Sequence, residues 1–446
     1  MVKVYVHLSD IHFGQETGGS VVIHADVKER LIEDVSQFVA ELPDGRADGV
    51  IVSGDIAYSG KRKEYTQAGE WLDRIAGAVG CAITDIQVVP GNHDIDQNEI
   101  SHASELMLKE IADNGEEALD KFLVADRDRE MLYARFSAYR PFAEGYDSPL
   151  DYNGGLAGDC IVELAPNRLL RFIGLNTALI CSKRDMEGAL LLGARQRVLP
   201  KTDGEELIVI GHHPLNWLQD SDDARRYLRS RARVFISGHE HILSVQADKI
   251  TADSDLLMLA AGATIPPSAN EFYKYTYNII EFDWDQELDA LCVIVHPRTW
   301  SDEHKIFEAD TALLGGKEPK FTLGCPQFRR GHLPAAVQEQ SQENGSTGKD
   351  TTVIKQVVQN TMGTEMVEGE QEQDNARMTS QYPLLLLRFF RDLAPGQRMA
   401  VLVKLGALPD DWPEPLTHTI ERRLLDSLNK EGRLGELEAA INDLEK

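Results

Sequence analysis

Five short apolar runs in this chain are each followed within a few residues by aspartate, asparagine or histidine. The runs are rich in β-branched and aliphatic residues and occupy 2–7, 50–52, 86–89, 207–210 and 234–236. The segments that follow them are SerAspIleHis (9–12), SerGlyAsp (53–55), GlyAsnHisAsp (91–94), GlyHisHisPro (211–214) and GlyHisGluHis (238–241). Short apolar runs of this kind are typical of buried β-strands. Polar side chains therefore follow hydrophobic strands repeatedly along the chain.

The segment between the first two runs has the pattern of an amphipathic helix. Over residues 26–42, apolar side chains that include Val27, Leu31 and Val35 recur on one helical face. Strands that alternate with such helices predict β-α-β crossovers and a largely parallel α/β core. In open α/β sheets the ligand site lies beyond the carboxyl ends of the strands, where all five polar segments stand.

The polar segments together supply a mixed set of oxygen and nitrogen ligands for metal ions. The candidate ligands are Asp10, His12, Asp55, Asn92, His212, His239 and His241. This set suits manganese first, with iron, zinc, nickel and cobalt as alternatives, whereas magnesium and calcium prefer oxygen ligands alone. Seven ligands serve two ions if one carboxylate bridges them. Two adjacent cations can stabilise both the attacking and the leaving oxygen at phosphorus, so the expected chemistry is phosphoester hydrolysis.

These motifs, in this order, resemble those of the calcineurin-like metallophosphoesterase superfamily over roughly residues 1–300. The resemblance implies that Asp10, His12, Asp55 and His241 hold one metal ion, and that Asp55, Asn92, His212 and His239 hold the other. Asp55 is then the bridge, and a hydroxide that bridges the two metal ions attacks the phosphorus. His93 is expected to protonate the leaving oxygen or to stabilise the transition state, and Asp94 to orient the ring of His93.

Other polar residues are weaker candidates. His213 adjoins a ligand and could line the site, although a supporting or packing role is expected. The net charge of −27 argues against a broadly basic nucleic-acid surface. Two short basic clusters, at 61–63 and 225–233, could still contact phosphate at the rim of the site. Their candidate substrate-binding residues are Arg62, Arg225 and Arg226, and the alternative for each is a solvated helix face.

The resemblance also implies a four-layer αββα sandwich, with late strands at 258–264, 277–282 and 291–296 in its second sheet. Domain boundaries are expected at 1–325 for the metallophosphoesterase domain, with a helical insertion at 97–150. That insertion follows His93 directly, so it could select substrate as a cap or serve as a buttress.

No apolar run approaches membrane length, and the five scattered cysteines indicate a reduced, cytoplasmic protein without a leader segment.

The last part of the chain changes in character. Residues 326–380 are rich in polar residues and glycine, which predicts a flexible linker. Residues 381–446 show about four helical segments, which predict a small all-α module. This module resembles the death-like effector-associated adaptor domains of bacterial defence proteins, which implies recruitment of a protein partner or self-association. Docking of the bundle onto the enzyme is the alternative.

Two classes of function are therefore expected. The first is a metal-dependent phosphohydrolase, with a phosphodiesterase or nuclease acting on nucleic acid or nucleotides preferred over a phosphomonoesterase or protein phosphatase. The second is a non-catalytic scaffold, which the complete ligand set argues against.

Overall fold

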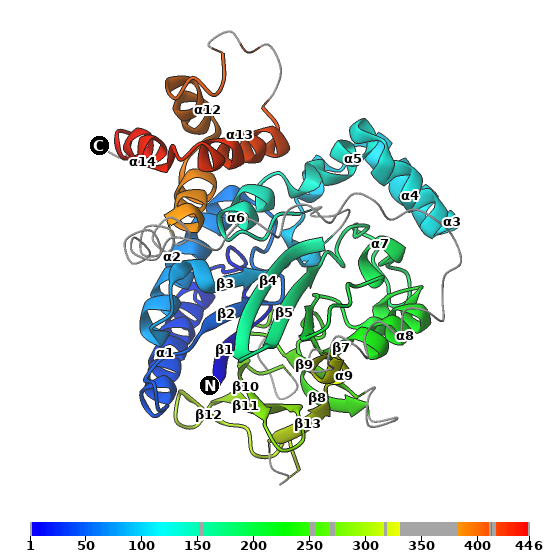
Figure 1. Cartoon of the computed structure of the whole chain (residues 1–446), viewed down its shortest axis with the longest axis vertical. Coiled ribbons are helices and arrows are strands. Elements are labelled where there is room, and N and C mark those ends of the chain that lie inside the picture. The colour runs from blue at the N-terminus through cyan, green and yellow to red at the C-terminus, as the bar shows by residue number, and fades with distance from the viewer. Residues whose placement is uncertain are drawn as a thin grey trace, which may run out of the picture.

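A computed structural model of the chain contains two β-sheets packed face to face, with helices outside them (Figure 1). It describes residues 2–150, 156–248, 255–267, 273–315, 319–330, 381–409, 412 and 416–444. The segment 331–380, to which most of the expected linker belongs, lies outside the described residues, so the linker stays a prediction.

The first sheet has the order β12-β11-β10-β1-β2-β3, with β13 paired to β11. Its strands are β1 (Lys3–Leu8), β2 (Gly49–Val52), β3 (Ile86–Val88), β10 (Thr276–Asp285), β11 (Ala290–Ser301), β12 (Ile306–Ala309) and β13 (Lys320–Gly324). The neighbours β1, β2 and β3 are parallel, and β10 pairs with β1 in the antiparallel sense. The expectation that the strands at 277–282 and 291–296 belong to the second sheet was wrong, because β10 and β11 extend the free edge of β1 instead.

The second sheet has the order β4-β5-β6-β7-β9-β8. Its strands are β4 (Leu156–Ala165), β5 (Arg168–Leu175), β6 (Glu205–Ile210), β7 (Ala232–Ser237), β8 (Leu243–Asp248) and β9 (Leu256–Ala261). Strands β5, β6, β7 and β9 are parallel to their neighbours in this series. The predicted parallel core is therefore confirmed in both sheets.

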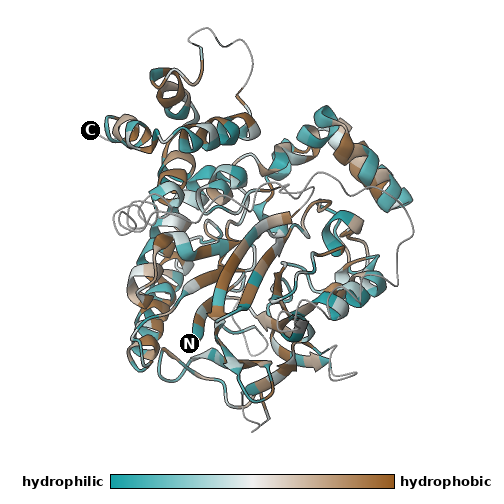
Figure 2. Ribbon diagram, in the orientation of Figure 1, coloured by the Kyte–Doolittle hydropathy of each residue, from teal (hydrophilic) through white to brown (hydrophobic). Residues whose placement is uncertain are grey.

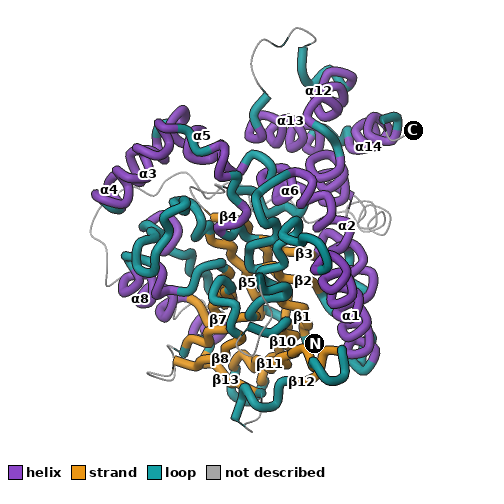
Figure 3. The backbone as a smooth tube through the Cα atoms, turned by 180° about the vertical axis from the view of Figure 1, so that it is seen from behind, coloured by secondary structure: helices purple, strands orange, loops and turns teal. Residues whose placement is uncertain are grey.

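The two sheets meet along their apolar faces (Figure 2). Tyr5 of β1 and Phe172 of β5 pack with ring centroids 4.9 Å apart, and Phe282 of β10 lies 5.9 Å from Phe172. Helices α1 (Ser20–Ala40) and α2 (Arg62–Val79) cover the first sheet, while α7 (Ala194–Arg197) and α8 (Ser221–Arg231) lie beside the second (Figures 1 and 3). The four-layer αββα arrangement is confirmed.

The segment after β3 forms the expected helical insertion. Its helices are α3 (His102–Asn114), α4 (Glu116–Val124), α5 (Asp126–Tyr133) and α6 (Tyr139–Gly145). At 326–330, where the linker was expected to begin, the chain instead forms the short helix α9 (Pro326–Arg330), whose Phe328 is buried in the core.

The C-terminal module is all-α, as expected. Residues 381–386 are helical and continue into a π-helical turn, η6 (Leu387–Asp392), which is followed by α12 (Pro395–Lys404), α13 (His418–Lys430) and α14 (Leu434–Asn442). These helices enclose a hydrophobic core of their own. The module packs on α6, and Leu387 is buried within the core of the larger domain.

Within the described ranges, none of the helices combines the length and apolarity needed to cross a membrane. All five cysteines are free of disulfides.

Candidate metal centre

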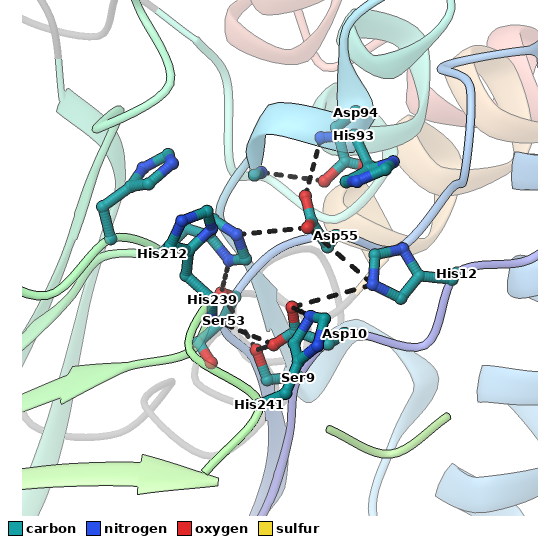
Figure 4. Close-up of polar contacts among 12 residues, drawn as sticks. Ser9, Asp10, His12, Ser53, Asp55, His93, Asp94, His212, His239 and His241 are labelled. Carbon is teal, nitrogen blue, oxygen red and sulfur yellow. Dashed lines mark hydrogen bonds and ion pairs between the residues drawn. The ribbon is translucent and has the colours of Figure 1, made fainter. Parts of the chain in front are cut away.

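The candidate ligands all emerge at the carboxyl ends of strands, and six of them, all except Asn92, are seen to converge in Figure 4. Asp10 and His12 follow β1, Asp55 follows β2, Asn92 follows β3, His212 follows β6, and His239 and His241 follow β7. The imidazole rings of His12, His212, His239 and His241 surround the carboxylates of Asp10 and Asp55. The structure therefore brings together ligands that are more than 200 residues apart in the chain.

Five of these ligands adopt left-handed backbone conformations. The φ angles are 52° at Asp10, 51° at His12, 52° at Asp55, 70° at His239 and 56° at His241. Residues other than glycine rarely adopt this region, and such strain clusters at functional sites because the surrounding structure has to maintain it. The sharp turns after the strands aim these side chains inward.

The glycines in the motifs are required by close packing around the ligands. A Cβ atom on Gly91 would lie 2.1 Å from Oδ1 of Asp55, and one on Gly54 would lie 2.5 Å from Nδ1 of His212. A Cβ on Gly238 would lie 1.9 Å from Oγ of Ser9. No larger side chain fits these positions without displacing a ligand or its neighbour.

The two expected groups of ligands share Asp55. In the first group, Oδ1 of Asp10 lies 3.0 Å from Nε2 of His241 and 3.8 Å from Nε2 of His12. Oδ2 of Asp55 lies 3.9 Å from Nε2 of His12 and 3.3 Å from Nε2 of His212. This carboxylate oxygen thus stands between an imidazole of each group, as a bridging ligand would.

Buried polar atoms without partners test whether these residues fit metal ions. Nε2 of His12 and Oδ1 of Asn92 are buried, and neither has a hydrogen-bond partner in the described part of the chain. Buried polar atoms are almost always paired, and a bound cation would supply the partner that these two atoms need. Both atoms belong to the expected ligand set, and its mixture of nitrogen and oxygen suits a divalent transition metal. The residues fit two such ions.

The protonation states of the imidazoles also bear on metal binding. Burial lowers the pKa of His12 to about 4, and burial lowers that of His239 to about 4 as well. Both rings are therefore neutral at pH 7, which is the form that binds a metal. Burial also lowers the pKa of His212, but the nearby Asp55 carboxylate outweighs it and raises the value to about 9. A cation would have to displace the proton from this ring.

Neighbouring groups hold the ligands in place. Nδ1 of His212 donates to the carbonyl of Ser53 at 2.8 Å, which leaves Nε2 facing the centre. Oγ of Ser9 donates to Oδ2 of Asp10 at 2.6 Å. Such supporting contacts orient metal ligands. Sequence reasoning did not find these two serine roles, although both residues lie within the motifs.

His93 stands beside the cluster but is held differently from the expectation. Its Nδ1 donates to the carbonyl oxygen of Tyr58 at 2.8 Å, and its backbone amide donates to Oδ1 of Asp55 at 2.8 Å. The expectation that Asp94 orients this ring was wrong. The Asp94 carboxylate instead accepts from the amides of Ala57 and Gly91 and from the hydroxyl of Tyr65, so it shapes the loop. A backbone carbonyl leaves no trace in the sequence, so its role could not be predicted.

His213 is fully buried behind the ligands. Its ring contacts Oγ1 of Thr177 at 2.9 Å and Sγ of Cys181 at 3.7 Å, and its centroid lies 4.4 Å from that of His239. Its ring also belongs, with His212 and His239, to a group whose ligand atoms lie within 4.8 Å of one another, so the supporting role expected for His213 stays a prediction.

A cavity beside His93 is lined by Tyr58, Ser59 and residues of the segment 92–98, and none of the three candidate arginines lines it. Arg62 lines a cavity between α2 and the C-terminal module. Arg225 forms an ion pair with Asp248 at 3.5 Å, and Arg226 pairs with Asp223 at 3.1 Å on the same helix. As substrate contacts they stay predictions.

Comparisons with known proteins agree with this architecture. The calcineurin-like phosphoesterase family matches residues 4–243, and the GTPase-associated adaptor domain matches residues 381–443. The chain is 24% identical over 358 residues to an uncharacterized metallophosphoesterase-like protein, YydB, of Bacillus subtilis strain 168, and the match covers 76% of this chain and 67% of that protein. The second family match covers the C-terminal module and fits its expected resemblance to adaptor domains.

Two solved structures are also similar. The purple acid phosphatase PPD1 of yellow lupin (Lupinus luteus) has 10% identity and a TM-score of 0.41, over 80% of this chain and 57% of that one. The NAD nucleotidase of Haemophilus influenzae has 10% identity and a TM-score of 0.33, over 69% and 53%. With the family match covering more than half of its residues, the chain belongs to the calcineurin-like phosphoesterase family.

Proposed function

We propose that this chain is a dinuclear-metal phosphodiesterase that acts on nucleic acid or nucleotides. The observation that carries the proposal is the position of Asp55, whose Oδ2 atom lies within 4 Å of both His12 and His212. Family membership supports metal-dependent hydrolysis of a phosphoester. Two divalent cations at such a centre would polarise the phosphoryl group and lower the pKa of a water molecule to about 7. Manganese is the ion that we expect first.

The role proposed for His93 is to donate a proton to the leaving oxygen. Its Nδ1 is committed to the carbonyl of Tyr58, so the tautomer and the plane of the ring are set by that bond. Nε2 is the nitrogen left for the substrate. Possible ligand atoms, one each from His12, Asp55 and His93, lie within 4.8 Å of one another, which supports a role for His93 next to the centre. A protonated ring can therefore reach an oxygen that departs from a phosphorus held at the centre.

The charge around the cavity beside His93 supports a diester over a monoester. This cavity of about 340 Å³ is lined by Tyr58 and Ser59 and by residues of the segment 92–98, with no lysine or arginine among its described lining residues. It contains the carboxylate of Asp96, to which the side chain of Lys61 is bound. A diester carries one negative charge where a monoester carries up to two, so a diester needs less positive charge from the protein.

The test is hydrolysis by purified chain that has been stripped of metal and reloaded with Mn²⁺. We expect faster hydrolysis of bis(p-nitrophenyl) phosphate than of p-nitrophenyl phosphate, and cleavage of a substrate among single-stranded DNA, RNA and cyclic nucleotides. A clear preference for the monoester would support a phosphomonoesterase or protein phosphatase instead. No hydrolysis with any transition metal would support a scaffold.

We also propose that the adaptor module recruits a protein partner or a second copy of the chain. Its match to an adaptor family and its separate core support this role.

The free state of all five cysteines supports a cytoplasmic location, which we propose for the chain.

A further inference from the structure

Two cavities meet at one residue between the metal centre and the helical insertion. The first is the cavity of about 340 Å³ beside His93. The second has a volume of about 600 Å³ and lies between α3 and the segment 180–190; we call it the α3 groove. Gln97 lines both cavities. A substrate whose leaving group occupies the first cavity can therefore continue into the α3 groove.

Gln97 has an unmet requirement for a hydrogen-bond donor. Its Oε1 atom is buried and accepts no hydrogen bond from the described residues. Buried amide oxygens are normally paired, and an orphan acceptor between two cavities suits a ligand that carries N–H or O–H groups. A nucleobase or a sugar offers such donors.

The α3 groove has apolar walls that are open to solvent. Its larger apolar lining residues are Ile100, Leu106, Leu108, Ile180, Met186 and Leu190. Leu106 is 57% exposed and Met186 is 67% exposed. Concave apolar surface with a few polar groups is the usual character of a binding site. Flat apolar rings such as nucleobases fit a wall of this kind.

The rim of the groove carries positive charge. Lys109 and Lys183 line it, both are exposed, and neither forms an ion pair with a described residue. Arg184 pairs with Glu105 at 3.5 Å, and Asp185 accepts a hydrogen bond from the amide of Ser182 at 2.7 Å. Two uncommitted lysines beside one apolar groove, in a chain of net charge −27, point to an anionic ligand.

Ion pairs hold the walls of the groove together. Besides the Arg184–Glu105 pair, Arg195 binds Asp120 at 2.7 Å and Arg197 binds Glu116 at 2.7 Å. They join the insertion helices α3 and α4 to the segment 184–197. The groove is therefore a formed feature between two tied elements.

We propose that the α3 groove binds a single-stranded nucleic acid, along the segment that continues from the leaving group. One base contacts the wall formed by Leu106 and Met186, the next phosphate lies at Lys109 and Lys183, and Gln97 accepts a hydrogen bond at the junction. The helical insertion thus selects substrate, and an oligonucleotide is bound more tightly than a small diester. This inference rests on the proposed function, because it takes the leaving group to lie beside His93.

The test measures binding of fluorescein-labelled hexathymidylate and hexauridylate by anisotropy at several salt concentrations. The full chain is loaded with Mn²⁺ and carries His93→Ala to slow cleavage. Each phosphate contact with a single strand contributes about 0.7 to the slope of log affinity against log salt. Lys109→Gln with Lys183→Gln should lower that slope by about 1.4 and weaken binding roughly five- to tenfold. Both lysines are exposed, so the metal content should not change.

The matched control is Lys121→Gln, which removes an exposed insertion lysine that pairs with Glu117 at 3.1 Å and does not line the groove. It should leave binding of the oligonucleotides almost unchanged. A double variant with the slope and affinity of the parent would overturn the inference, as would a parent that binds neither oligonucleotide. With His93 intact, hydrolysis of bis(p-nitrophenyl) phosphate tests the proposed function separately. The double variant should retain that activity. If the chain hydrolyses the diester but its His93→Ala form, with both lysines intact, binds neither oligonucleotide, the groove alone would be refuted.

Discussion

Arg391 is predicted to hold the adaptor module on the catalytic domain. From η6, its guanidinium donates two hydrogen bonds to the carboxylate of Asp73, at 2.6 and 3.0 Å, and one to the hydroxyl of Tyr146 at 2.9 Å. The small residues Gly69 and Gly145 make room for it, since a Cβ at either would lie 3.3 or 3.0 Å from its side chain. Arg391→Ala should therefore weaken docking without disturbing the metal centre.

The size of the effect follows from the exposure of the two partners. The Arg391 side chain is 11% exposed and that of Asp73 is 34% exposed. Hydrogen bonds to charged groups contribute about 1.5–3 kcal/mol. Because water can reach Asp73 after the change, the loss should fall short of the 3–5 kcal/mol seen on breaking a fully buried pair. We expect a loss of about 2 kcal/mol, which is roughly a 30-fold change in the docking constant.

Hydrogen exchange measures this change in the intact chain. Backbone amides of η6 and of α6 that exchange when the module opens should exchange roughly 30-fold faster in Arg391→Ala. The control is Arg433→Ala, because Arg433 pairs with Glu436 at 2.7 Å inside the module. Unchanged protection of α6 in Arg391→Ala would refute the assigned role of this arginine.

Three further changes have defined outcomes. His93→Ala should retain both metal ions and lose about 10²- to 10⁴-fold in turnover, and loss of metal from this variant would contradict its role as proton donor. Gly91→Ala should lower metal occupancy, because its Cβ would lie 2.1 Å from Asp55, whereas Gly77→Ala, which meets nothing within 4 Å, should not. Burial lowers the pKa of His7 from 6.5 to about 3, so this ring binds a proton more readily in the unfolded chain than in the folded one. The free energy of unfolding should therefore fall as the pH drops from 6.5 to about 3. Between pH 7 and 5 the unfolding free energy should fall by about 2 kcal/mol more than in His7→Gln, and equal falls would show that His7 is not the group responsible.

The clustering of the candidate ligands could be predicted because each motif couples local geometry to chemistry. A strand has to end, a glycine has to admit the neighbouring ligand, and an aspartate or histidine has to follow, so the pattern is visible without any long-range contact. Gly91 and Gly54 illustrate this, since their Cβ positions would overlap Asp55 and His212. The helical insertion and the C-terminal helices were visible for a similar reason, as apolar periodicity is a local signal.

Features that depend on backbone atoms or distant pairs could not be predicted in this way. The carbonyl of Tyr58, which holds His93, has no sequence signature. The pairing of β10 with β1 joins strands more than 250 residues apart, and either sheet would have accepted its apolar pattern. The docking of Arg391 on Asp73 spans 318 residues and shows no periodicity. The arginines at 225 and 226 looked available in the sequence, but acidic neighbours already bind them.

The most direct test of the proposed dinuclear centre is the metal content of the purified chain. Saturation with Mn²⁺, followed by removal of free metal and elemental analysis, should give two ions per chain, as the two ligand groups that share Asp55 require. Asp55→Asn should reduce this content sharply, because it removes the carboxylate charge at the proposed bridge. A wild-type chain that holds one ion or none at saturation would contradict the account.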